Sequence, residues 1–221
     1  MESYEIKAGN RAAWLLASAF GSFAGLGGIR HAIGEILQGN IVPSGIVIES
    51  WAEGPIATNM GGEPGMTIIP NMLVTGLLGL AISVFVLVWS IWFVRRKNGG
   101  RVLLLLSILM LLFGGGFGPP IIGILAGVAG LGIRAPLNGW RTRLPAGIRR
   151  FLASLWPWVF LVAVLNGLFL FVLSAILVFF FQVNNPDLFL NSFYFAVGSL
   201  LIAIFTGIAF DGNQQEKNIA V

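Results

Sequence analysis

Residues 95–134 read RRKNGGRVLLLLSILMLLFGGGFGPPIIGILAGVAGLGIR, and the interruption in the middle of this stretch decides how the chain folds. Two apolar runs, residues 102–113 and 121–133, lie on either side of it. The interruption itself consists of Gly114, Gly115, Gly116, Phe117, Gly118, Pro119 and Pro120. Consecutive glycines lose much backbone entropy in a helix, and proline lacks the N–H donor that a helix interior needs. The sequence therefore predicts two short helices with a break between them.

The two flanking helices are too short to cross a membrane singly. Each would measure roughly 18–20 Å at a rise of about 1.5 Å per residue, whereas the hydrocarbon core of a bilayer is about 30 Å thick. Basic residues stand at both ends of the stretch, in residues 95–101 and from Arg134 onwards, and such residues mark the cytoplasmic side of a membrane protein. We therefore expect residues 102–133 to form a hairpin that enters and leaves on the basic side, either re-entrant or as two short spans.

Longer apolar runs on both sides of the hairpin predict full membrane spans, because a span needs about 20 apolar residues. These runs are residues 12–36, 71–94, 158–181 and 191–210. Pro157 is expected at the inner entry of the third span, and Asn191 or Ser192 is expected to cap the fourth. The predicted fold class is all-α: a polytopic helical membrane protein in one integral membrane domain, residues 1–221, with four full spans and one Gly/Pro-interrupted hairpin.

The basic residues predict the orientation of these spans. All of the 13 Lys and Arg residues except Arg30 lie in alternate polar segments: the N-terminal segment, residues 95–101, residues 134–150 and the C-terminal tail. The other two polar segments, the outer loop at residues 38–70 and the turn at residues 182–190, contain no Lys or Arg. By the positive-inside rule, both termini and the basic loop at residues 134–150 face the cytoplasm. The expected location is the plasma membrane of a prokaryotic cell.

The composition excludes a soluble domain and narrows the partners. Hydrophobic residues make up 57% of the chain and charged residues 10%, against roughly 45–50% and about 25% in soluble domains, so lipid must cover the surface. The net charge of +4 does not indicate a nucleic acid, because juxtamembrane basic residues meet anionic lipid headgroups. The expected partners are the bilayer, those headgroups on the basic side, and either a second copy of the chain or another membrane subunit. The chain has no Cys, and no cofactor or metal is predicted.

The tip of the hairpin, residues 114–120, is the first candidate functional site. Irregular backbone at membrane depth is tolerated only where protein buries it or water reaches it. Free N–H groups at the start of the second short helix would favour an anion, and free carbonyl groups would favour a cation, so the tip can line a pathway. The alternative is a tight turn packed against the first span, whose Gly21 and Gly25 form a GxxxG pair that allows close helix contact.

Three residues near the outer end of the first span form the second candidate site. His31 and Glu35 are spaced i, i+4 on a helix and face the same way, so they can share a hydrogen bond or a cation, or relay a proton. Ionisable residues at membrane depth are usually functional. The alternative is an interfacial ion pair, in which Arg30 pairs with a glutamate of the outer loop. The outer-loop glutamates are Glu49, Glu53 and Glu63.

No sequence motif identifies a reaction. The motifs HExxH and GxSxG of hydrolytic enzymes are absent, no pair of aspartates lies within a predicted span, and no catalytic residue is predicted. Asn166, Ser199 and Thr206 lie within predicted spans, and we expect them to make hydrogen bonds between helices.

Three functions remain open. In the first, the chain is a small transporter or channel subunit that uses the tip at residues 114–120 to line a pathway, which predicts a hydrated cavity reaching the tip. In the second, it is a non-catalytic scaffold or accessory subunit, which predicts a dry tip. In the third, it is a membrane-embedded enzyme that uses His31 and Glu35, which predicts a cleft joining both residues to the outer loop.

Overall fold

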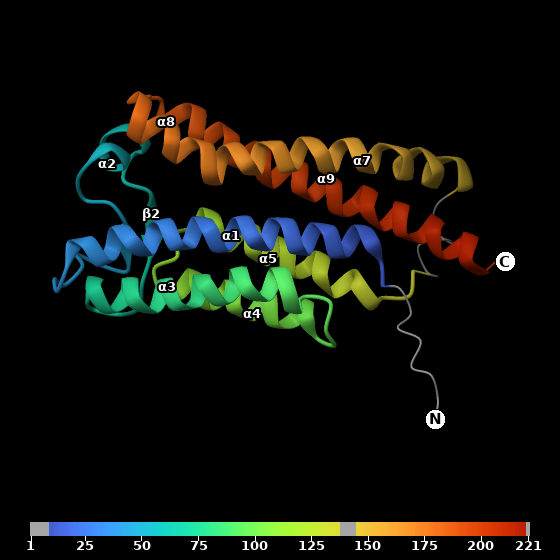
Figure 1. Ribbon diagram of the computed structural model, residues 1–221, viewed down its shortest axis with the longest axis horizontal. Coiled ribbons are helices and arrows are strands. Elements are labelled where there is room, and N and C mark those ends of the chain that lie inside the picture. The colour runs from blue at the N-terminus through green and yellow to red at the C-terminus, as the bar shows by residue number, and fades with distance from the viewer. Residues whose placement is uncertain (1–8, 138–144, 220–221) are drawn as a thin grey trace.

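The computed structural model describes residues 9–137 and 145–219, which fold into a helical bundle with one small sheet (Figure 1). The helices are α1 (Arg11–Gln38), α2 (Pro55–Met60), α3 (Met72–Val88), α4 (Gly99–Leu112), α5 (Gly118–Leu131), α7 (Ala146–Leu168), α8 (Ser174–Phe181) and α9 (Pro186–Ile219). Helix α1 lies in the middle of the bundle. It packs against α3 and α5 on one side, where α4 also packs on α5, and against α9 and α7 on the other.

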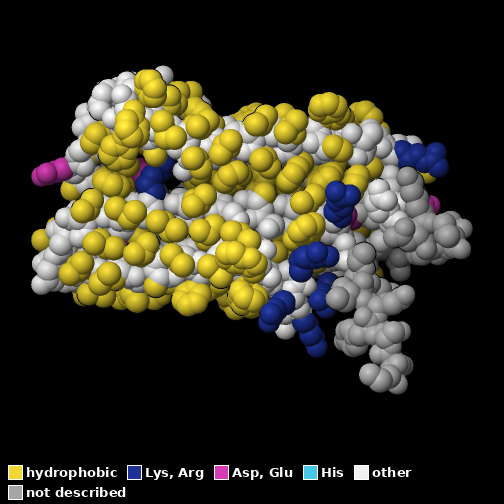
Figure 2. All heavy atoms as spheres, viewed as in Figure 1, with side chains coloured by type: hydrophobic (Ala, Val, Ile, Leu, Met, Phe, Trp, Pro, Cys, Tyr) yellow, Lys and Arg dark blue, Asp and Glu magenta, His cyan; other side chains and the backbone are white. Residues whose placement is uncertain are grey.

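Four helical segments are long and apolar enough to cross a membrane, judged by length and composition. They are Arg11–Gln38, Met72–Phe93, Ala146–Phe181 and Pro186–Glu216. Hydrophobic side chains cover most of the face seen in Figure 2, and most of the visible Lys and Arg side chains gather at its right-hand end. This architecture is that of a multi-pass membrane protein. We call the end with the Lys and Arg side chains the inner end, and the end with residues 38–70 the outer end.

The interruption of the hairpin is present, and it is shorter than predicted. Helix α4 ends at Leu112, and only residues 113–117 leave the helix, because α5 already begins at Gly118. The two prolines of the motif lie in the first turn of α5, where the N–H groups have no partner within the helix. Gly114 and Gly116 have φ angles of 87° and 76°, which residues with a side chain rarely adopt. The prediction that this motif breaks the helix is confirmed.

The third long helix begins earlier than predicted. Helix α7 starts at Ala146, within the predicted basic loop, and runs through Pro157; the entry of the span into the membrane at Pro157 stays a prediction. The neighbouring Trp156 is buried and stacks on Phe210 of α9, with 4.6 Å between the ring centroids. Packing at this position holds the helix across the proline. Residues 138–144 of the predicted basic loop lie outside the described residues.

The fourth long helix also begins before its predicted cap. Helix α9 starts at Pro186, and the side-chain oxygen of Asn185 accepts a hydrogen bond from Leu188 N at 3.0 Å. Asparagine is a favoured N-cap and proline a favoured first helical residue. The cap is therefore Asn185, and the prediction of Asn191 or Ser192 is wrong.

The predicted hydrogen bonds between helices form at one of three residues. Asn166 of α7 donates to Ser192 O at 2.9 Å, and the Ser192 hydroxyl donates to Asn166 Oδ1 at 2.8 Å. Ser199 and Thr206 instead donate to carbonyl oxygens of their own helix, α9. A Ser or Thr hydroxyl reaches the carbonyl three or four residues earlier in a helix, so the prediction is wrong for these two residues.

Buried Asp211 joins α9 to the start of α1 at the inner end. Its two carboxylate oxygens accept hydrogen bonds from Ala12 N at 2.9 Å and from Ala13 N at 3.0 Å. The carboxylate thus caps the N-terminus of α1, where N–H groups lack helical partners and the helix dipole favours negative charge. Helix α9 continues to Ile219, so residues beyond Phe210, where the last span was predicted to end, are also helical.

Glycines allow α1 and α3 to pack backbone against backbone. A Cβ atom on Gly21 would overlap the side chain of Ser90, and a Cβ atom on Gly25 would lie 2.8 Å from Leu87 N. The hydroxyl of Ser18 donates to Ser90 O at 2.8 Å across the same interface. The GxxxG pair of the first span therefore serves close packing against the helical segment that follows the outer loop.

Candidate functional site

The outer loop was predicted without secondary structure, and it contains a small antiparallel sheet. Strand β1 (Val47–Glu49) pairs with strand β2 (Pro64–Met66). Strands of three residues are too short to show the alternation of polar and apolar residues by which a strand is recognised in a sequence. The sheet matters because β2 leads the chain inward, to the tip of the α4–α5 hairpin.

Backbone hydrogen bonds attach the hairpin tip to β2. Gly114 N donates to Met66 O at 2.9 Å, and Phe117 N donates to Pro64 O at 3.2 Å. The residue after β2, Thr67, forms a further bridge with the start of the tip. Three of the four glycines of the tip, Gly114, Gly115 and Gly116, are buried. Protein therefore surrounds the tip in this structure, and its irregular backbone has partners in the outer loop.

The two candidate sites predicted from the sequence form a single site. A Cβ atom on Gly114 would overlap the carboxylate of Glu35, and a Cβ atom on Gly116 would overlap the imidazole of His31. Both side chains therefore reach from α1 to the tip and occupy the space that its glycines leave open. The positive φ angles of these glycines impose the same requirement for glycine.

The remaining residues of the tip pack against helices. Gly115 lies against Met110 of α4, because a Cβ atom there would overlap that side chain. The ring of Pro119 lies beside Gly27 of α1, and Gly118 lies beside Phe193 of α9. Phe117 and Pro120 belong to the same segment, with the Phe117 N–H bonded to β2 and Pro120 buried in the first turn of α5. Only Gly114 and Gly116 thus contribute to the polar site.

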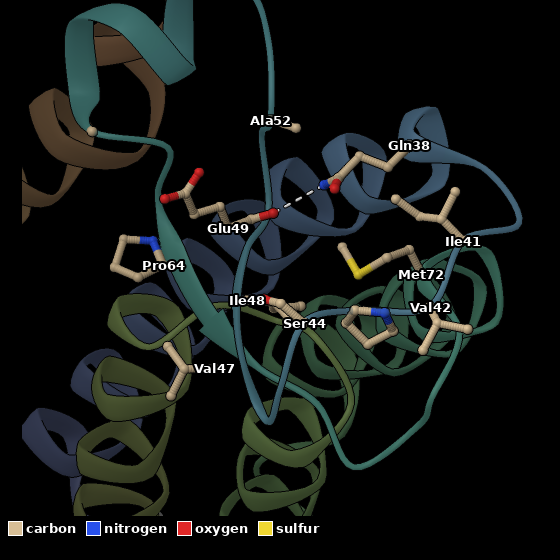
Figure 3. Close-up of a pocket in the computed structure, with 12 residues that line it drawn as sticks. Gln38, Ile41, Val42, Ser44, Val47, Ile48, Glu49, Ala52, Pro64 and Met72 are labelled. Carbon is tan, nitrogen blue, oxygen red and sulfur yellow. Dashed lines mark hydrogen bonds between the residues drawn. The ribbon is translucent and has the colours of Figure 1, made fainter.

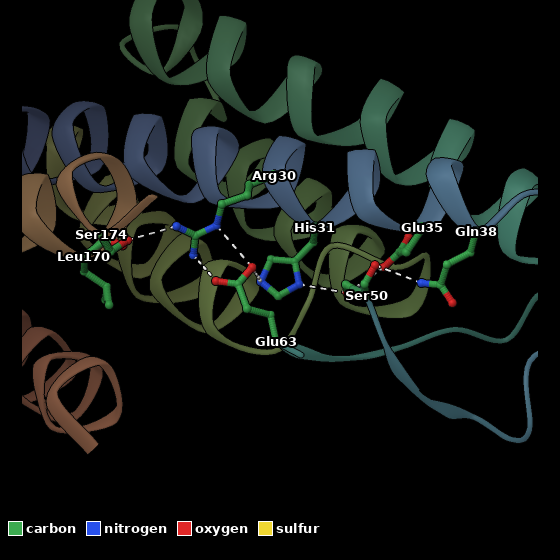
Figure 4. Close-up of polar contacts among 8 residues, drawn as sticks. All are labelled: Arg30, His31, Glu35, Gln38, Ser50, Glu63, Leu170 and Ser174. Atoms are coloured by element: carbon green, nitrogen blue, oxygen red, sulfur yellow. Dashed lines mark hydrogen bonds and ion pairs between the residues drawn. The ribbon is translucent and has the colours of Figure 1, made fainter. Parts of the chain in front are cut away.

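Ser50, which follows β1, links His31 to Glu35 (Figure 4). Its Oγ lies 2.9 Å from His31 Nδ1 and donates to Glu35 Oε1 at 3.0 Å. The exposed fraction is 4% for His31 and 0% for Ser50 and Glu35. Sequence reasoning missed Ser50, because a single serine in a polar loop carries no signal of burial.

Arg30 pairs with Glu63 of the outer loop, as predicted for an outer-loop glutamate. Arg30 Nε donates to Glu63 Oε2 at 3.1 Å, and Nη2 contacts Glu63 Oε1. Arg30 Nη1 donates to Ser174 Oγ of α8 at 3.0 Å, so the guanidinium also reaches the third long helix. Glu63 adopts a left-handed φ of 49°, which costs a residue with a side chain about 1–2 kcal/mol. The loop holds this glutamate inward against a conformational cost.

The polar groups form a chain from the outer loop to the hairpin tip. Glu63 Oε2 lies 3.7 Å from His31 Nε2, and the chain continues through Ser50 to Glu35. It ends at Glu35 Oε2, a buried atom with no hydrogen-bond partner among the described residues. Such an atom is rare in folded proteins and costs about 1–3 kcal/mol. Within residues 9–137 and 145–219, no group of three or more His, Cys, Asp or Glu residues could hold a metal ion.

A pocket of about 450 Å³ opens in the outer loop beside these polar residues (Figure 3). Its lining is mainly apolar, with polar groups from Gln38, Ser44 and Glu49. Gln38 Nε2 donates to Glu49 O and to Ser50 O, at 2.9 Å in each case. One wall of the pocket is therefore bonded to the backbone of the buried serine. The hairpin tip does not line the pocket.

Comparisons with protein-family models, with curated proteins and with solved structures found no match for this chain. What the protein does is therefore inferred from its own site. Three features carry that inference: the buried chain of polar groups, its contact with the glycines of the hairpin tip, and the pocket that lies beside it at the outer end.

Proposed function

We propose that this chain is a small transporter or channel subunit that responds to protons, and that its outer side is closed here. The observation that carries the proposal is the buried polar chain from Glu63 through His31 and Ser50 to Glu35. Imidazole, hydroxyl and carboxyl groups joined by hydrogen bonds, as His31, Ser50 and Glu35 are, can pass a proton from one to the next, and Glu63 lies 3.7 Å from the imidazole. Glu35 Oε2, which has no partner among the described residues, is the place where such a proton binds.

A purely structural role does not account for the free-energy cost of burying these polar side chains. A buried ion pair is often no more stabilising than well-packed apolar residues of the same volume, and Glu35 Oε2 adds an unpartnered polar atom. Ionisable residues at membrane depth mark proton relays and ion pathways. The arrangement of Arg30, His31, Glu35 and Glu63 at the end of a membrane helix fits that use.

Proton binding at Glu35 acts on the hairpin tip. The carboxylate occupies the space beside Gly114, and the Gly114 N–H is bonded to Met66 O of β2. A proton on the carboxyl group removes its negative charge and converts one acceptor oxygen into a donor. Protonation therefore changes the contacts between the Glu35 side chain and the tip backbone beside Gly114. Residues 113–117 and β2 therefore form the gate. Opening the gate joins the outer pocket to the tip.

The charged groups around Glu35 come from two elements. Arg30 and His31 lie on α1, and Glu63 lies in the outer loop beside them. Helices α3 and α5 contain no charged residue, and Arg101 of α4 lies at the inner end of its helix. The proposed response to pH is therefore assigned to His31 and Glu35, which Ser50 connects.

A non-catalytic scaffold is the second candidate, and the buried tip favours it. The tip glycines are covered by protein and bonded to β2, and a tip that only packs would look the same. The two functions differ in what protons do to the tip. A scaffold keeps the contact between residues 113–117 and β2 at every pH at which it is folded, whereas a proton-controlled gate releases it over part of the pH range.

The test uses the absence of Cys from the chain. Phe117→Cys places one thiol at the tip, and a membrane-impermeant maleimide added from the outside of proteoliposomes reports whether it is accessible. Because maleimide reacts with the thiolate, each labelling rate is normalised to that of Gly45→Cys, an exposed position of the outer loop. We expect the normalised labelling of Phe117→Cys to change with pH when Glu35 is present. Glu35→Gln removes the titrating group at nearly constant shape, so normalised labelling of the double variant becomes independent of pH.

Glu53→Gln is the matched control, because Glu53 is an exposed glutamate of the same outer loop. We expect it to leave the pH dependence of Phe117→Cys labelling unchanged. Labelling that is equally slow at every pH, with and without Glu35, would support the scaffold. PH dependence that survives Glu35→Gln would show that another group controls the tip.

A further inference from the structure

A second pocket, of about 260 Å³, lies at the inner end, where the chain passes from α3 to α4 and leaves α5. Its charged lining residues are all basic: Arg96, Lys97, Arg101 and Arg134. We propose that this pocket binds a phosphate group, and that the group is the headgroup phosphate of an anionic membrane lipid. This site is separate from the outer site and does not depend on the function proposed for it.

The four cations of the pocket lack acidic partners in the part of the chain that the structure describes. Within those residues, ion pairs connect Arg30 to Glu63 and Arg149 to Glu216, and none involves a cation of this pocket. Four neighbouring positive charges without a counter-charge repel one another, and an anion between them removes that repulsion. The pocket therefore carries a charge that a phosphate complements.

Local contacts hold three of the guanidinium groups in place before any ligand binds. Arg134 Nη2 donates to Arg95 O at 3.0 Å, and Arg101 Nη1 donates to Asn98 Oδ1 at 3.3 Å. The guanidinium of Arg96 lies over the ring of Phe93, 4.7 Å from its centroid. Each group keeps further N–H donors, because a guanidinium has five. Arginine in this arrangement suits the bidentate recognition of phosphate oxygens.

Glycines shape the floor of the pocket. A Cβ atom on Gly100 would overlap the backbone of Gly130, so α4 and α5 meet here without side chains between them. This close approach brings the basic residues before α4 and after α5 to the same opening. Asn98 is the N-cap residue of α4, but its side chain makes no capping hydrogen bond and accepts a hydrogen bond from Arg101 instead.

The surroundings favour a lipid as the source of the phosphate. Leu131 lines the same pocket and is 45% exposed, which leaves an apolar side chain for an acyl chain to contact. Basic pockets between membrane helices on the cytoplasmic side bind lipid headgroups in this way. A free phosphate ion would use the same arginines and would make no contact with the apolar surface.

Thermal unfolding of the full chain in a neutral detergent tests the site, read by the fluorescence of its Trp residues. The probes are a short-chain phosphatidylglycerol, inorganic phosphate and, as the uncharged-headgroup control, a short-chain phosphatidylcholine. We expect phosphatidylglycerol to raise Tm, because a ligand that binds only the folded state stabilises it. Arg101→Gln and Arg134→Gln, each alone, should weaken the apparent affinity about tenfold, the usual effect of one lost charge-assisted contact.

Arg150→Gln is the control for net charge, because Arg150 is exposed on α7 and does not line the pocket. It should keep the full shift in Tm. Native mass spectrometry of the same variants counts retained lipid molecules and gives an answer even if a variant is less stable. An equal, pocket-dependent shift with inorganic phosphate would show that free phosphate is the ligand. Shifts that Arg101→Gln and Arg134→Gln do not reduce relative to Arg150→Gln, or no shift with any probe, would overturn the proposal.

Discussion

The two ends of α1 each have a buried carboxyl group beside them, and the two groups are bonded differently. At the inner end, Asp211 is 3% exposed, and its oxygens accept hydrogen bonds from Ala12 N and Ala13 N. At the outer end, Glu35 is 0% exposed, and among the described residues it has one hydrogen-bond partner, Ser50, which donates to its Oε1. Buried polar groups in structural roles are normally satisfied. The difference agrees with Asp211 as a helix cap and with the functional role that we propose for Glu35.

The residues around each carboxyl group differ in the same way in their hydrogen bonding. At the inner end, Asn10 donates to Gly132 O at 2.6 Å and to Ala135 O at 3.0 Å, and Gln215 donates to Asn10 Oδ1 at 2.7 Å. These bonds connect α1, α9 and the segment after α5 in a satisfied network. At the outer end, the polar chain connects α1 to a loop and a glycine tip. The inner end is a satisfied hydrogen-bond network, and the outer end is where we propose that contacts change.

Replacement of the inner carboxyl group should have the largest effect on stability. Asp211→Ala removes the partner of two N–H groups at the start of α1, that of buried Ala12 and that of half-buried Ala13, and we expect it to cost about 2–4 kcal/mol. Chemical denaturation in detergent measures the loss. The control is Glu216→Gln on the same helix, whose side chain is 53% exposed in its pair with Arg149. That change should stay within about 1 kcal/mol, and an equal loss in both variants would contradict the assignment of Asp211 as a cap.

Substitution of a tip glycine should have the next largest effect. Gly116→Ala forces a side chain into a left-handed φ and into the His31 ring, and we expect a cost of about 1–3 kcal/mol. Gly198→Ala in α9 is the control, because nothing lies within 4 Å of its added Cβ. It should stabilise the protein by up to about 1 kcal/mol, since alanine is the better helix former. If Gly116→Ala is no more destabilising than Gly198→Ala, His31 does not occupy the space beside Gly116.

The smallest effect on stability is expected at the outer carboxyl group. Glu35→Gln keeps an oxygen for the Ser50 hydroxyl, and Glu35 Oε2 has no bond to lose. The free energy of unfolding should therefore change by less than about 1 kcal/mol. Asp211→Asn, which loses one of two accepted bonds, should cost about 1–2 kcal/mol. The same denaturation experiment compares them, and a larger loss for Glu35→Gln would make Glu35 the structural group of the two.

Features with a local cause could be predicted from the sequence. The three consecutive glycines of the tip interrupt the helix, the prolines that follow lie in the first turn of the next helix, and the long apolar runs form helices. The pairing of Arg30 with an outer-loop glutamate followed from charge alone, because Arg30 is the only basic residue on that side. Charge alone did not predict that the partner of Arg30 is Glu63, because Glu49 and Glu53 lie in the same loop.

Features that depend on tertiary contacts could not be predicted in this way. His31 and Glu35 contact the tip only because α1 and the α4–α5 hairpin pack in one particular register along the helix axis. Ser50 becomes part of the site only because β1 and β2 turn the outer loop inward. The sequence predicted Asp211 as the start of a polar tail, because no neighbouring residue indicates that the N-terminus of α1 lies beside it.

Infrared difference spectroscopy of the protein in lipid tests most directly whether Glu35 binds and releases a proton. The C=O stretch of a protonated carboxyl group is compared at low and high pH in the wild-type chain, in Glu35→Gln and in the control Glu53→Gln. We predict a pH-dependent carboxyl band that Glu35→Gln abolishes and Glu53→Gln leaves intact. If the difference spectrum of Glu35→Gln is identical to that of the wild-type chain, Glu35 does not titrate, and the proton-controlled gate is wrong.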